Sequence, residues 1–136
     1  MRRLLRSTEG ASVTELAFVL PVVLLLLMGT MEAAHALGTW VTLTNEAREA
    51  ARYGVAGVRD GDASIVTEIQ TYAKGRASGT LDTSKLTVTP TITAQSGMTA
   101  GSVKVVESYP LTFATPFMQK IMGSPTVYGQ AVMRAE

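Results

Sequence analysis

An uninterrupted apolar run near the start of the chain gives way to helical and then to strand-like patterns. Residues 16–31 carry no charge and are mostly Leu, Val and Met. As a helix this run spans about 24 Å, against about 30 Å for the hydrocarbon core of a bilayer. Extending the helix to Leu37 makes it long enough to cross the hydrocarbon core, but the extended segment includes Glu32 and His35. We therefore predict a membrane-spanning helix over residues 11–37. Glu32 and His35 lie at the membrane–water boundary or, alternatively, form a polar contact between packed helices.

The helical pattern continues beyond the apolar run with a different character. Apolar and small residues recur there at spacings of three and four, which is typical of a helix with one buried face. We predict one long helix over residues 12–55, kinked at Pro21 and ending in the glycine-containing stretch 54–57. Glu49 and Arg52 form a predicted i,i+3 pair. The predicted face towards the sheet comprises Ala47, Ala50, Ala51 and Gly54, and Trp40 is either an interfacial anchor or part of the core.

The remainder of the chain predicts one more amphipathic helix and a small sheet. Asp62 is the predicted N-cap of a helix over residues 63–77, which Ser78-Gly79-Thr80 ends. Strands are predicted over 86–93, 103–113 and 126–133, with a hairpin loop at 95–101 and a short helix or turn at 116–122. Pro90 makes the first strand either an edge strand or a bulged one, and Pro110 bends the second.

Side-chain patterns also predict which residues face the core. The second helix has an apolar face of Ile65, Ile69, Tyr72 and Ala73, and the last strand offers Val127, Tyr128, Ala131 and Val132. In the middle strand we place Val103, Val105 and Ser108 on one face and Lys104, Val106 and Glu107 on the other. The predicted fold class is α+β, with a long, partly transmembrane N-terminal helix packed on a small antiparallel sheet.

Charge and composition narrow the function. Arg2, Arg3 and Arg6 precede the apolar run and Arg48 is the first basic residue after it, so the positive-inside rule places the N-terminus in the cytoplasm. A net charge of +1 with no clustered basic face argues against nucleic-acid binding. The chain has no cysteine, and His35 is its single histidine. We expect no enzyme, no metal or other cofactor and no small-molecule substrate.

A specific arrangement surrounds the start of the apolar run. A basic head is followed by Gly10, then by Glu15 five residues later, and the hydrophobic helix begins at the next position. This spacing resembles the processing site of type IV pilin-like precursors. Three sequence segments resemble the TadE-like family of the Tad (Flp) pilus system. They are EGASVTELA at 9–17, LPVVLLL at 20–26 and TNEAREAARY at 44–53.

The TadE-like resemblance implies a pseudopilin or minor pilin. It implies a leader peptide over residues 1–10, removed by a prepilin peptidase that cuts between Gly10 and Ala11 on the cytoplasmic side. The transmembrane helix at 11–37 is then retained, with an extracytoplasmic domain at 38–136. The implied partners are the prepilin peptidase, other pilin and pseudopilin subunits, and membrane lipid.

Glu15 and the small residues of the helix are the candidate assembly sites. An ionised carboxylate at the edge of hydrocarbon is costly unless it is paired, and cleavage creates an α-ammonium at Ala11. The resemblance favours pairing of Glu15 with that amine in a neighbouring subunit. Alternatively, Glu15 is a first-turn acid stabilised by the helix dipole. Candidate helix-packing residues are Pro21, Gly29, Ala33, Ala36, Ala47 and Ala51, although small residues are also simply common in such helices.

Two other functions fit the same N-terminus. Ala34-His35-Ala36 has the A-x-A form of a signal-peptidase site, so cleavage after Ala36 would release a small secreted binding domain. That leader would be longer than the usual 15–30 residues, and its removal would cut a continuous helix. The remaining alternative is an uncleaved single-pass membrane protein of unrelated function.

Overall fold

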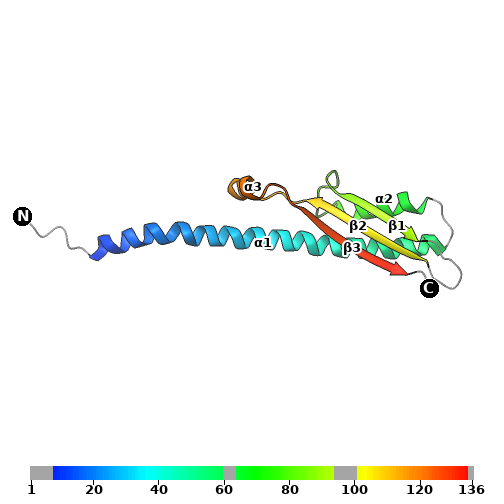
Figure 1. The fold of residues 1–136 in the computed structure, drawn as a ribbon, viewed down its shortest axis with the longest axis horizontal. Coiled ribbons are helices and arrows are strands. Elements are labelled where there is room, and N and C mark those ends of the chain that lie inside the picture. Colours follow the sequence, from blue (N-terminus) through cyan, green and yellow to red (C-terminus); the bar gives the residue numbers. More distant parts are fainter. Residues whose placement is uncertain (1–7, 60–63, 94–100, 135–136) are drawn as a thin grey trace, which may run out of the picture. The chain divides into compact units, whose positions relative to one another are not determined.

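The computed structural model describes residues 8–59, 64–93 and 101–134. The chain divides into two compact units, unit 1 (Met1–His35) and unit 2 (Ala36–Glu136). Helix α1 (Thr8–Arg59) runs through both units as one assigned helix, and the other elements lie in unit 2 (Figure 1). These are α2 (Ile65–Ala77), β1 (Thr87–Thr93), β2 (Ser102–Pro110), α3 (Pro116–Met122) and β3 (Thr126–Arg134). The predicted α+β fold is confirmed.

The three strands form an antiparallel sheet in the order β1-β2-β3. Pro90 lies in the edge strand β1, opposite Val105, where its missing N–H removes no bond from the sheet interior. The prediction extended the middle strand to Phe113. Strand β2 instead ends at Pro110, because the chain turns there into the connection that carries α3. The predicted edge position of β1 is confirmed.

One face of the sheet is covered by α2 and by the part of α1 in unit 2. The buried core joins side chains from both helices and the sheet. It comprises Leu43, Ala47, Ala50, Ala51, Ile65, Ile69, Ala73, Ala77, Leu86, Val88, Val103 and Val105. The alanine-rich face of α1 lets the helix lie close to the sheet, as the spacing predicted. Trp40 is 51 % exposed, so it is not part of this core.

Helix α1 continues past the glycines that were predicted to end it. A Cβ added to Gly54 would lie 3.0 Å from a methyl carbon of Val103, and one added to Gly57 would collide with Ile65. Both glycines therefore mark close approaches of α1 to its neighbours, and the helix extends to Arg59. The predicted end at 54–57 is wrong because glycine is used here for packing and not as a C-cap.

Helix α2 begins later than predicted. Its N-cap is Ser64 and its first residue is Ile65, whereas the sequence suggested Asp62 and Ala63. Asp62 itself lies outside the described residues, as does most of the predicted hairpin loop at 95–101. The Ser64 hydroxyl donates a hydrogen bond to the Glu68 carboxylate at 2.7 Å. Glu68 lies in the first turn of α2, where the helix dipole favours an acid.

Two strand faces were predicted incorrectly. Glu107 shares the buried face with Val103 and Val105, because positions two apart in a strand point the same way. In β3, Tyr128 and Val132 are 60 % and 59 % exposed. Val127 and Ala131 pack against the core as predicted, and Met133 packs there as well.

Gly129 fixes how closely β3 approaches α1. A Cβ built there would lie 2.6 Å from the carbonyl oxygen of Leu43 and would also meet that residue's carbonyl carbon. Because the obstacle is helix backbone, a side-chain rotation cannot relieve the clash. The sheet and α1 are therefore in contact through main chain at this position.

We predict that Gly129→Ala destabilises unit 2 by about 1–3 kcal/mol, the usual cost of overpacking a well-packed core. The matched control is Gly75→Ala on α2, where an added Cβ meets nothing within 4 Å. That change is expected to be neutral or stabilising by about 0.5–1 kcal/mol. Chemical unfolding of the full chain in detergent measures both, and equal stabilities of the two variants would contradict the proposed contact.

Candidate functional site

The apolar part of α1 in unit 1 exposes its side chains on every side. Phe18 is 77 % exposed, Leu26 is 66 % and Met31 is 67 %, and the large apolar residues between Val13 and Met31 are all exposed. Full burial of one such side chain is worth about 1.5–3 kcal/mol. A helix that is apolar all round requires a membrane or other helices around it. Helix α1 is long and apolar enough to span a membrane.

The predicted processing residues lie in the first turns of α1. Gly10, Ala11 and Glu15 are exposed, and the Thr14 hydroxyl donates to the Gly10 carbonyl at 2.8 Å. The bond between Gly10 and Ala11 thus lies within the first helical turn, whose N–H groups lack intrahelical partners. Ala11 and Glu15 are four residues apart on this helix, so they share one face.

The candidate helix-packing residues divide between two environments. Pro21 and Ala33 are exposed, Gly29 and Ala36 are partly exposed, and a Cβ added to Gly29 would meet nothing within 4 Å. Ala47 and Ala51 are fully buried in the core of unit 2. The structure therefore does not bring all these residues into one surface, and Ala47 and Ala51 serve the sheet of their own chain.

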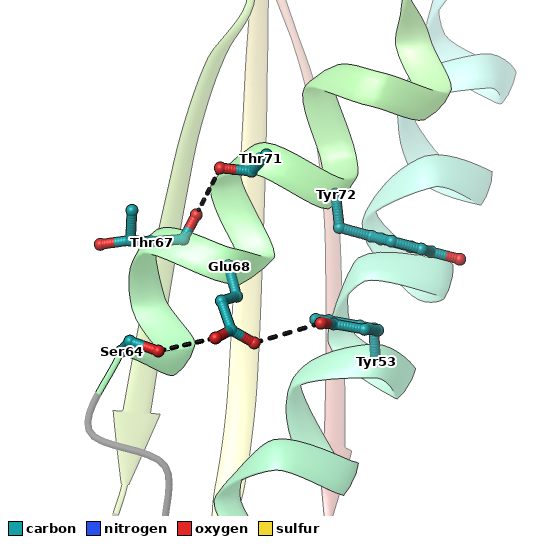
Figure 2. A pocket seen from close by; sticks show the side chains of 6 residues that line it. All are labelled: Tyr53, Ser64, Thr67, Glu68, Thr71 and Tyr72. Atoms are coloured by element: carbon teal, nitrogen blue, oxygen red, sulfur yellow. Dashed lines mark hydrogen bonds between the residues drawn. The ribbon is translucent and has the colours of Figure 1, made fainter.

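A second feature is a hollow on the surface of unit 2, between α1 and α2 (Figure 2). Its volume is about 370 Å³, and its lining includes Tyr53 and Tyr72, whose rings stack with centroids 4.5 Å apart and planes 5° apart. Glu68 accepts hydrogen bonds from Tyr53 at 3.2 Å and from Ser64 at 2.7 Å. Both of its oxygens are thereby engaged within the protein, so this cluster joins α1 to α2.

A third feature, which was not predicted from the sequence, is a pair of buried carboxyl groups in the core of unit 2. Glu107 on β2 is 0 % exposed and Glu46 on α1 is 9 % exposed. Among the described residues, no group hydrogen-bonds to either oxygen of Glu107 or to Oε2 of Glu46. Two features of the sequence indicated that these residues are buried. Strict alternation after Val103 puts Glu107 on the buried face of its strand, and Glu46 lies next to Ala47 on the packed side of α1.

Burial determines the ionisation of this pair. Burial, together with the neighbouring Glu46 carboxyl, raises the pKa of Glu107 to about 7. Burial also raises the pKa of Glu46, although the charge of Arg76 and a hydrogen bond from Thr80 act in the opposite direction. Since two close carboxylates cannot both ionise cheaply, the pair holds a proton near neutral pH.

Metal binding requires several ligating side chains in one place. Clusters of three or more His, Asp or Glu side chains that could hold a metal ion are missing from these ranges. The pair Glu46–Glu107 is enclosed, and the Glu68 carboxylate is occupied. The apolar surface of α1, in contrast, is exposed and available to partners.

We predict that the buried pair makes unit 2 more stable in mild acid. In the folded protein the pKa of Glu107 lies above the ordinary value of 4.5. The contribution of protonated Glu107 to the free energy of unfolding is therefore complete below pH 4.5 and is lost as the pH rises to about 7. The full loss is on the order of 3 kcal/mol, at about 1.4 kcal/mol per pKa unit. Glu107→Gln, which carries no charge, should flatten this dependence in thermal unfolding measured between pH 5 and 8. An unchanged slope in Glu107→Gln would contradict the assignment.

Comparison with known proteins supports the N-terminal resemblance. The family model described as TadE-like protein matches residues 10–52. Comparisons with curated proteins and with solved structures gave no match. The matched segment begins at the predicted processing glycine, includes the whole exposed apolar run, and ends on the buried alanine-rich face of α1. Residues 10–52 of the chain are therefore similar to the TadE-like family.

Proposed function

We propose that this chain is a minor pilin or pseudopilin with a structural role in assembling a Tad-type pilus, and that it is not an enzyme. The observation that carries the proposal is the apolar surface of α1, exposed on all sides within the TadE-like segment. In the membrane this surface is covered by lipid. In a filament or its tip, the same surface packs against the helices of sister subunits.

The proposal includes maturation by a prepilin peptidase between Gly10 and Ala11. The mature chain starts within α1 and keeps the entire apolar run, so cleavage leaves the anchor in place. Cutting there requires the first helical turn to unwind and the bond from Thr14 to the Gly10 carbonyl to break. Helix ends fray readily, because their N–H groups are unsatisfied.

The proposed topology places the N-terminus in the cytoplasm and unit 2 outside the cell membrane. The basic residues before the apolar run support this orientation. Secretion after cleavage at Ala36 is less well supported. Helix α1 passes through Ala34–Ala36 without interruption, and its continuation supplies Leu43 and Ala47 to the core.

We predict that co-expression with a prepilin peptidase yields a mature protein that begins at Ala11. Intact mass and N-terminal sequencing measure this directly. Gly10→Leu should abolish processing, because the larger side chain obstructs close passage of the chain through the peptidase. A product that begins at Leu37, or an intact Met1 with an active peptidase present, would reject the proposed maturation.

We further predict that Glu15→Ala leaves membrane insertion normal and reduces incorporation into the filament at least about tenfold, because the amine of Ala11 loses its partner. The matched control is Glu49→Ala, which removes a partly exposed acid from the same helix. Glu49 instead pairs with Arg52 at 3.0 Å. Membrane fractionation and immunoblotting of sheared filaments give the two readouts. Equal incorporation of both variants would remove Glu15 from its proposed role.

A further inference from the structure

The connection between β2 and β3 carries an apolar helix that has no core to pack against. None of the residues of α3 is buried, and Phe117, Ile121 and Met122 are 56 %, 64 % and 60 % exposed. A helix of seven residues is far shorter than the 12–15 at which isolated helices become even marginally stable in water. Its exposed apolar side chains therefore indicate a partner outside the chain.

The connection is nevertheless held in one conformation by polar contacts. The Gln119 side chain accepts a hydrogen bond from the Phe113 N–H at 3.0 Å and donates to the Gly123 carbonyl at 2.9 Å. Pro116 begins the helix, and Gly123, with a φ of 67°, ends it. These contacts satisfy the backbone from within the loop, and the apolar side chains remain directed outward.

Contacts within unit 2 locate α3 along the domain. Strand β3 meets α1 at Gly129 and Leu43, and Val103, the sheet partner of Met133, meets α1 at Gly54. Strand β3 therefore runs in the same direction as α1, and its first residue lies towards the Ala36 end of unit 2. Helix α3 immediately precedes β3, at the end of the sheet where β2 finishes (Figure 1).

Covalent continuity identifies the end of unit 2 that joins unit 1. Ala36 follows His35 directly, so the end of unit 2 that holds α3 is the end that joins the apolar segment of α1. Leu37 and Trp40, on α1 at this end, are also 62 % and 51 % exposed. Between Leu111 and Pro125 the only charged residue is Lys120. Apolar side chains with a lysine and no acid suit the headgroup layer of an anionic membrane.

We propose that α3 inserts its apolar side chains Phe117, Ile121 and Met122 into the extracytoplasmic headgroup region of the bilayer that α1 spans. This inference rests on the proposed membrane anchoring of α1. Helix α3 then acts as a second, shallow contact that fixes the tilt and height of unit 2 over the membrane. Lys120 places its ammonium among the lipid phosphates.

The test uses the single tryptophan of the chain. Trp40→Phe/Phe117→Trp moves the reporter to α3, and Trp40→Phe/Val66→Trp places it on α2, where Val66 is also exposed and where neighbouring Ile65 contacts the far part of α1 at Gly57. The full chain is reconstituted in phosphatidylcholine/phosphatidylglycerol vesicles, with lipids brominated near the headgroup as quenchers. We expect at least about twofold stronger quenching at position 117 than at position 66, together with a blue-shifted emission. Trp40→Phe/Ile121→Trp should repeat the result.

The outcomes separate this inference from the proposed function. Vesicle flotation reports the anchoring of α1 in the same samples. Flotation with equal, weak quenching at 117 and 66 overturns the α3 inference and leaves the anchor intact, whereas absence of flotation overturns the anchor. A blue shift at 117 that lipid bromine does not quench, and that disappears on dilution of protein in lipid, identifies a second copy of the chain as the partner and overturns the lipid assignment. Lys120→Glu should reduce the quenching in anionic vesicles but not in pure phosphatidylcholine.

Discussion

One helix must satisfy two apolar environments at once, and this requirement shapes the whole molecule. In unit 1 the side chains of α1 are large and exposed, as at Phe18 and Leu26. In unit 2 the same helix presents small side chains, such as Ala47 and Ala50, that are completely buried. Burial of large apolar side chains against lipid or neighbouring helices is favourable, while small side chains let a sheet approach the helix closely. Side-chain size along α1 thus separates its exposed apolar surface from the surface that packs in the chain's own core.

The close approach of helix and sheet has consequences for the interior of unit 2. Gly129 allows main chain to meet main chain at Leu43, and its partner across the sheet is Glu107. The interior is therefore narrow at the position where a carboxyl group is buried. A carboxyl group enclosed there avoids the cost of a buried charge by keeping its proton, which raises its pKa. The resulting acid pair in the core makes the domain sensitive to pH near neutrality.

Patterns that depend on local sequence were read correctly, and those that depend on distant contacts were not. The long helix, the edge position of β1 and the short α3 follow from apolar spacing and from Pro90 and Pro116. The end of α1 was misplaced because Gly54 looked like a helix terminus, whereas it packs against Val103. Glu107 was placed on the face opposite Val103 and Val105, although its position two residues after Val105 puts it on the same face as they are.

In the proposed topology, the apolar segment of α1 lies inside the bilayer while unit 2 lies outside the cell membrane. Because the chain has no cysteine, single substitutions give a clean readout of exposure to a membrane-impermeant maleimide in intact cells or spheroplasts. Gly75, where an added Cβ meets nothing within 4 Å, offers a neutral reference position for Gly75→Cys. The account predicts rapid labelling of Gly75→Cys from outside and labelling of Leu24→Cys only after denaturation in detergent. Labelling of both positions at the same rate in intact membranes would contradict it.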